Sequence, residues 1–194
     1  MANHVNGYVS IRTISEEGQQ VWDKIVSDLE AKRGEGEYEV HLGHFIFEDF
    51  DNDWDFNRMC DEIGAKWAYV TDMDESGMSM YSAWSPVGEF VDTVAKMIGE
   101  VDPSIQIVLT YEDEFPNFVG VATFTKDGLD TDNVLESDEI MVLMKMHEPE
   151  LEELWDEDNE EWKDEDRAWE LIYEIQWDII NNWQADNEDW SITF

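Results

Sequence analysis

The segment Glu150–Glu170, ELEELWDEDNEEWKDEDRAWE, holds twelve acidic and two basic residues. Carboxylates this dense repel one another and attract cations or a basic protein surface. Side chains three or four positions apart on a helix lie about 5–6 Å apart. Phosphates along a DNA strand have a similar spacing, because the strand winds around an axis with one charge per about 3.4 Å. The segment therefore predicts rows of negative charge that resemble a duplex backbone.

Seven acids of this segment form the candidate partner-binding surface: Glu150, Glu153, Glu157, Glu160, Glu161, Asp164 and Glu170. We expect Trp155, Trp162 and Trp169 to anchor the acidic helices on the core, because fixed charge loses less entropy on binding. The alternative is generic acidity, as in proteins from salty cytoplasm, where salt screens the repulsion and solubility is gained. The concentration of the charge favours the first interpretation.

Two patterns resemble metal sites. An EF-hand reading of the segment that starts at Asp51 places acids and amides at most of the required positions, but Phe56 stands where that loop needs glycine. His41 and His44 are three apart, so on a strand they would point to opposite faces. We predict no metal or cofactor, and a divalent-cation site around Asp49–Asp55 is kept as a minor alternative.

Catalytic patterns are weak in this sequence. Carboxylates are plentiful, but a general acid needs a raised pKa in a buried site, and no carboxylate lies in a recognisable apolar pattern. There is no Ser-His-Asp spacing, glycine-rich phosphate loop or nucleophile elbow, and Cys60 is expected on a helix face that packs into the protein core. The prediction is a protein that is not an enzyme.

Composition narrows the partners and the compartment. The chain has 194 residues, 42% of them hydrophobic and 13% aromatic, which is enough for a folded core. A net charge of −38 excludes direct binding to nucleic acid or anionic membrane, because phosphate contacts need Lys and Arg. One cysteine permits no internal disulfide, and no secretory signal or membrane span is recognisable. We expect a host-cytoplasmic protein.

Periodicity predicts an α+β domain over residues 1–128 and a helical extension over 129–194. Alternation indicates a strand at 7–14, and Ser15 is expected to cap a helix that runs to about Arg33. Further elements are a weaker extended segment at 37–47, a short helix near 51–64, hairpins at 65–84 and 104–128, and a helix from Ser85 to about 101. Residues 129–138 resemble a linker, 139–146 fit a strand or a helix, and a helix starts near Asp166.

Three motifs between Gly64 and Gly128 resemble the YubB-type ferredoxin-like family of phages and plasmids. They are a Gly-x-Lys-Trp segment, a Trp-Ser-Pro helix start and a Tyr-Glu strand paired with a glycine strand: Gly64, Lys66 and Trp67; Trp84, Ser85 and Pro86; Tyr111, Glu112, Phe118 and Gly120. The chain departs at Val87, where a second proline is usual, in lacking an N-terminal cysteine, and in its acidic extension. The resemblance implies a ferredoxin-like antiparallel sheet with helices on one face and a mobile-element origin, and it implies no reaction.

Together these features predict a non-enzymatic, phage-type acidic protein. It would inhibit a host nucleic-acid-binding protein with a basic surface by mimicking the charge of DNA. The alternative is a structural module that forms a homodimer or larger homo-oligomer through the apolar helical stripe Trp169–Trp183, with acidity serving solubility.

Overall fold

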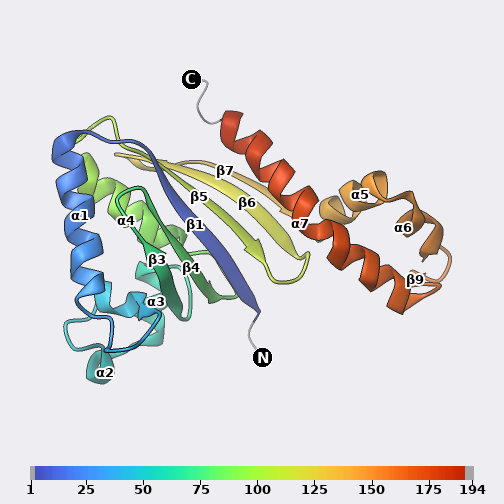
Figure 1. Ribbon diagram of the computed structural model, residues 1–194, viewed down its shortest axis with the longest axis horizontal. Helices are drawn as coiled ribbons and strands as arrows, with labels where there is room; N and C mark the ends of the chain where they lie inside the picture. Colours follow the sequence, from blue (N-terminus) through green and yellow to red (C-terminus); the bar gives the residue numbers. More distant parts are fainter. Residues whose placement is uncertain (1–2, 191–194) are drawn as a thin grey trace.

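The computed structural model describes residues 3–190 and has two lobes (Figure 1). A seven-stranded antiparallel sheet, in the order β2-β3-β4-β1-β5-β6-β7, forms the larger lobe with its helices. The elements are β1 (His4–Thr13), α1 (Glu16–Glu30), β2 (Val40–His41), η1 (Leu42–Phe45), α2 (Phe50–Asp53), α3 (Phe56–Glu62), β3 (Ala68–Met73), β4 (Gly77–Ala83), α4 (Gly88–Gly99), β5 (Gln106–Asp113), β6 (Phe118–Thr125), β7 (Gly128–Glu136), α5 (Ser137–His147), α6 (Pro149–Leu154), β8 (Trp155–Asp156), β9 (Glu161–Trp162) and α7 (Glu165–Trp190). The predicted α+β class is confirmed.

The helix after β1 begins where the sequence predicts. The Ser15 hydroxyl accepts a hydrogen bond from the Gly18 amide at 3.1 Å, which satisfies one free N–H of the first turn of α1. Trp22, Ile25 and Leu29 then face the sheet and are buried. The Trp22 indole also donates to the Asp74 carbonyl at 2.9 Å, so α1 is fixed to the β3–β4 turn.

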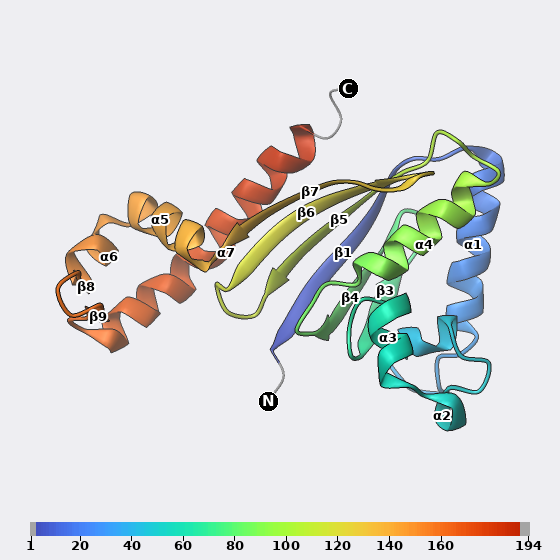
Figure 2. The same cartoon turned by 180° about the vertical axis from the view of Figure 1, so that it is seen from behind.

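Helices α1 and α4 cover one face of the sheet (Figure 2). The predicted hairpin at 104–128 is confirmed as β5 and β6, and alternate residues of β5, Ile107, Leu109 and Tyr111, point into this core. On β6, Ala122 and Phe124 point to the same side, whereas Val119 joins a second core on the opposite face. Strand β6 is therefore buried on both faces, and it connects the two lobes.

Two sequence predictions at the sheet edges are wrong. The linker interpretation of residues 129–138 fails because Gly128–Glu136 pairs with β6 as edge strand β7. Its polar sequence reflects exposure, since acids such as Asp130 suit an unpaired edge. In the predicted extended segment at 37–47, Val40–His41 forms the short strand β2, and the 3-10 turn η1 follows it. The His41 ring accepts a hydrogen bond from the Gly43 amide at 2.8 Å and so caps this turn.

The smaller lobe consists of α5, α6, the β8–β9 hairpin and the N-terminal half of α7 (Figure 1). Residues 139–146 are helical, in α5. Ile140, Met144, Leu151, Ala168 and Leu171 pack together as its core. The C-terminal half of α7 lies on the second sheet face, where Gln184 donates to the Tyr111 carbonyl at 3.1 Å and Glu188 pairs with Arg12. Residues 191–194 of the predicted extension lie outside the described residues.

Candidate protein-binding surface

The seven predicted surface acids lie in the smaller lobe, on four different elements. Glu150 and Glu153 are in α6, Glu157 and Glu160 in the β8–β9 turn, Glu161 on β9, Asp164 just before α7, and Glu170 in α7. Six of them are exposed and Glu150 is half-buried. The structure brings them to one lobe but does not align them on one helix.

The expectation that the acids form rows on helices is wrong for residues 155–162, because the chain leaves the helical conformation at Trp155, where ψ is 131°. The Asp156 carboxylate accepts hydrogen bonds from the Asp158 and Asn159 amides at 3.0 and 3.2 Å, which closes a turn. Glu160 completes the reversal in the left-handed region, at φ 54°. Asp and Asn side chains thus stabilise a hairpin where charge spacing alone suggests a helix.

The hairpin tip is held by its tryptophans. The Trp155 and Trp162 rings meet edge to face at 5.0 Å between centroids, and the Lys145 ammonium lies 4.8 and 5.8 Å from the two rings. Lys163 donates its ammonium to the Glu153 carbonyl at 2.9 Å. Trp162 and Trp169 pack against the core of the smaller lobe, as predicted, whereas Trp155 contacts Trp162 and Lys145.

Arg167 joins α6 to α7. Its guanidinium donates to both carboxylate oxygens of Glu150 at 2.9 and 3.1 Å and to Glu170 at 2.6 Å. The hydrogen bonds lower the pKa of Glu150 and raise the pKa of Arg167. Glu150 and Glu170 are therefore structural as well as acidic, and their charge is partly neutralised.

The remaining five predicted acids make no ion pair within residues 3–190: Glu153, Glu157, Glu160, Glu161 and Asp164. Charge is also denser in this part of the chain. Residues 129–194 carry 23 acids and three bases, a net −20, whereas the longer segment 1–128 carries 26 acids and eight bases, a net −18. The acids are thus denser in the last third of the chain, which comprises strand β7, the smaller lobe and all of α7.

The apolar stripe that suggested self-association is mostly used inside the molecule. Ile172 and Ile179 are buried, and Trp169 and Trp183 pack partly against the same core. Gln176, on that stripe, is also buried. A different side of α7 is exposed, with the Tyr173 and Trp177 side chains 52% and 53% accessible.

The histidines form an aromatic cluster. The His41 and His44 rings lie 4.2 and 4.9 Å from the Phe50 ring. Burial, followed by the charge of His44, lowers the pKa of His41 to about 4. Among the described residues, no group of three or more His, Cys, Asp or Glu side chains is placed to hold a metal ion. The acidic segment with the EF-hand pattern forms the short helices α2 and α3.

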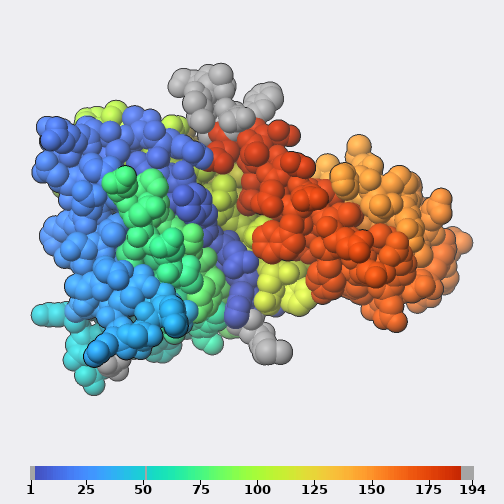
Figure 3. Space-filling view, in the orientation of Figure 1, coloured from blue at the N-terminus to red at the C-terminus, as the bar shows by residue number. Residues whose placement is uncertain are grey.

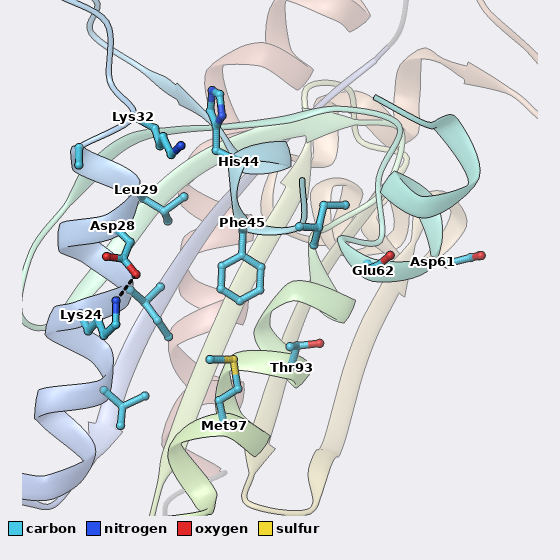
Figure 4. Close-up of a pocket in the computed structure, with 14 residues that line it drawn as sticks. Lys24, Asp28, Leu29, Lys32, His44, Phe45, Asp61, Glu62, Thr93 and Met97 are labelled. Carbon is cyan, nitrogen blue, oxygen red and sulfur yellow. Dashed lines mark hydrogen bonds and ion pairs between the residues drawn. The ribbon is translucent and has the colours of Figure 1, made fainter. Parts of the chain in front are cut away.

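A hollow of about 800 Å³ lies between α1, η1, α3 and α4 (Figure 4). Phe45 and Met97 point into it, and a Lys24–Asp28 ion pair at 2.6 Å lies on its α1 side. Its other charged groups lie at its edges. Such a lining can hold an apolar group.

Two of the three sequence motifs come together just before α4. The Ser85 hydroxyl donates to the Gly64 carbonyl at 2.5 Å, and the Lys66 ammonium lies 4.9 Å from the Trp84 ring. Gly64 has a φ of 96°, and a Cβ there would press on the Pro86 carbonyl. These contacts hold the segment after α3 against the segment before α4, which is a structural role.

The sequence did not predict a groove around Glu112. A polar groove of about 360 Å³ lies on the second sheet face beside α7, and Glu112 is buried in it. The sequence singled out Glu112 only as part of a motif, because nothing in strand alternation shows that a helix far along the chain will cover it.

Comparison of the chain with protein-family models, with curated proteins and with solved structures gives no match. No helix among residues 3–190 has the length and apolar character needed to cross a bilayer. The function must therefore be argued from the surfaces described above.

Proposed function

We propose that the chain is a non-enzymatic, phage-type acidic protein that inhibits a host nucleic-acid-binding protein by presenting DNA-like charge. The observation that carries this proposal is the β8–β9 tip, which holds five acids within Asp156–Glu161 at the end of the smaller lobe. The partner would offer the basic surface that normally binds phosphates, and host cytoplasm is the proposed compartment.

The acids of the β8–β9 tip are held on a rigid frame, unlike those of a flexible acidic tail. The Trp155–Trp162 pair, the Asp156 turn and the Arg167 bridge hold the acids before any partner arrives. Binding then loses less conformational entropy than it would for a flexible acidic segment.

The larger lobe supports the fold part of the proposal. Strands β3-β4-β1-β5 are adjacent in that order, and helices α1 and α4 follow β1 and β4 on one face. This is the arrangement of a ferredoxin-like unit, which we propose as the core, extended by β2 on one side and by β6 and β7 on the other. The same unit contains the residues that resemble the YubB-type family.

Charge reversal at the tip tests the function. The double substitution Glu153→Lys and Glu157→Lys is compared with Glu35→Lys and Glu100→Lys, which change the net charge equally at exposed sites of the larger lobe. The immobilised protein is used to capture host proteins, and bound proteins are eluted with rising salt or with duplex DNA. We expect the tip variant to lose capture by about tenfold or more and the control to retain it.

Competition gives the decisive result. A captured protein that duplex DNA displaces, and that salt releases, supports mimicry. Capture that is insensitive to salt, or that the two variants lose equally, would overturn the proposal.

Self-association is the second candidate function, and the exposed Tyr173 and Trp177 of α7 favour it. Light scattering of the wild type and of Trp177→Ala tests it. A dimer that the substitution dissociates supports this candidate, and a monomer at all concentrations removes it.

A further inference from the structure

The groove beside α7 lies on the face of the sheet opposite α1 and α4. Figure 3 views this face, with α7 in red next to the strands. Strands β1, β4 and β5 form the floor, and the C-terminal half of α7 contributes Asn181 and Gln184. The groove is separate from the acidic tip, because β8 and β9 contribute no residue to it.

The floor residues come from adjacent register positions. Tyr81, Asn6 and Glu112 are cross-strand partners on β4, β1 and β5, so they form one row across the sheet. Tyr8 and Thr110 belong to the next row of the same face. Among the described residues that line the groove, Glu112 is the one with a formal charge.

Glu112 is buried, and its Oε2 atom has no hydrogen-bond partner among residues 3–190. Its side chain is 9% exposed. Two nearby donors are used elsewhere: Tyr81 donates to Glu39 at 2.5 Å, and Gln184 donates to the Tyr111 carbonyl. Burial raises the pKa of Glu112 to about 7. A buried oxygen that lacks a partner is costly, so the site gains free energy from any ligand that supplies a donor.

The lining selects the chemistry of that ligand. The net charge of −38 repels anions, and a lone carboxylate attracts a cation. Tyr8 and Tyr81 add flat aromatic surfaces, while Asn6, Thr110 and Asn181 add amide and hydroxyl groups. A guanidinium group is planar, carries five donors, pairs with a carboxylate through two hydrogen bonds and stacks on aromatic rings. An ammonium group matches the charge of Glu112 but not the planar shape or the paired hydrogen bonds of a guanidinium group.

We propose that this groove is a binding site for a guanidinium group, with Glu112 as its anionic partner and Tyr8 and Tyr81 as its aromatic surfaces. The group can belong to a free small molecule or to an arginine side chain of another protein. The inference rests on the groove alone and does not depend on the proposed function of the acidic tip.

Titration calorimetry of the full chain tests the site with two probes. Agmatine represents a free small molecule, and N-acetyl-arginine amide represents an arginine in a protein. N-acetyl-citrulline amide is the neutral isostere and N-acetyl-lysine amide the ammonium control. Moderate salt weakens attraction to the general negative charge. We expect binding at one site for a guanidinium probe, about tenfold weaker binding of the lysine probe, and none of the citrulline probe. The tighter of the two guanidinium probes identifies the source.

Glu112→Gln removes the charge with little change of shape, and Glu114→Gln is the matched control at an exposed position two residues along the chain. We expect the first to weaken guanidinium binding by about tenfold or more and the second to leave it unchanged. Tyr8→Ala, at a side chain that is 46% exposed, gives a second variant that should weaken binding without disturbing the core.

Chemical-shift mapping separates this site from the acidic tip. Shifts at Tyr8 and Thr110 support the proposal. Shifts confined to residues 155–162, or equal binding by wild type and Glu112→Gln, would overturn it and leave the function proposed for the tip untouched. Absence of any binding by both guanidinium probes would also overturn it.

Discussion

Replacement of Glu112 by glutamine is expected to make the stability of the protein less dependent on pH. Burial raises the pKa of Glu112 in the folded protein to about 7, against an ordinary value of 4.5. Between these values the folded state holds a proton that the unfolded state releases. The stabilisation by this proton is therefore complete below about pH 4.5 and is lost as the pH rises through 7.

The magnitude follows from the two pKa values. Each tenfold difference in proton affinity corresponds to about 1.4 kcal/mol, so full ionisation of Glu112 lowers the free energy of unfolding by about 3 kcal/mol. About 2.5 kcal/mol of this falls between about pH 5 and pH 8. The side chain is 9% exposed, so solvent screens little of the effect. Glutamine does not ionise, so the Glu112→Gln variant does not lose this part of the free energy of unfolding as the pH rises.

Urea unfolding of the wild type, Glu112→Gln and Glu114→Gln at several pH values measures the effect. Urea is preferred to guanidinium chloride, whose cation is the proposed ligand of the groove. Repulsion among the other acids changes all three proteins alike and cancels in the difference. The stability of Glu112→Gln relative to the wild type should rise by about 2.5 kcal/mol from about pH 5 to pH 8, while that of Glu114→Gln stays constant. Parallel curves for the wild type and Glu112→Gln would refute the burial argument.

Three further predictions follow from single contacts. Thr123→Val should raise the free energy of unfolding, measured in urea, by about 1 kcal/mol, because the buried Thr123 hydroxyl lacks a hydrogen-bond partner among the described residues. A loss of stability would show that the hydroxyl has a partner. Gly120→Ala should lower the free energy of unfolding by about 2 kcal/mol and also lower the midpoint of thermal unfolding, because the added methyl group would enter the space of the Tyr111 ring on the neighbouring strand. An unchanged midpoint would contradict this packing. Trp155→Ala should speed hydrogen exchange of the backbone amides at 155–162 by about tenfold and leave the exchange of the β5 amides unchanged. Unchanged exchange at 155–162 would show that the indole pair does not hold the tip.

The tip illustrates how local chemistry can override charge periodicity. The acids from Glu150 to Asp164 recur at helical spacing, which predicts a helix. Asp156 and Asn159 form turn hydrogen bonds instead, at 3.0 Å between their side chains, and Trp155 meets Trp162 across the reversal. A tight Asp-rich turn between two tryptophans was the signal in the sequence that could have indicated the hairpin.

Local patterns determined much of the larger lobe. The Ser15 cap and the two hairpins needed only neighbouring residues, so the sequence alone predicted them. The acidic surface was also predictable as a set of residues, because exposure follows from charge at this density.

Tertiary structure decided the remaining features, because they depend on segments far apart in the chain. Strand β7 is polar and exposed, so only its pairing with β6 defines it. Glu112 resembles any other carboxylate in this acidic sequence until α7, some 70 residues further on, covers its strand and removes it from water. Burial of a single charge is a property of the assembled fold, and a linear pattern of residues does not contain it.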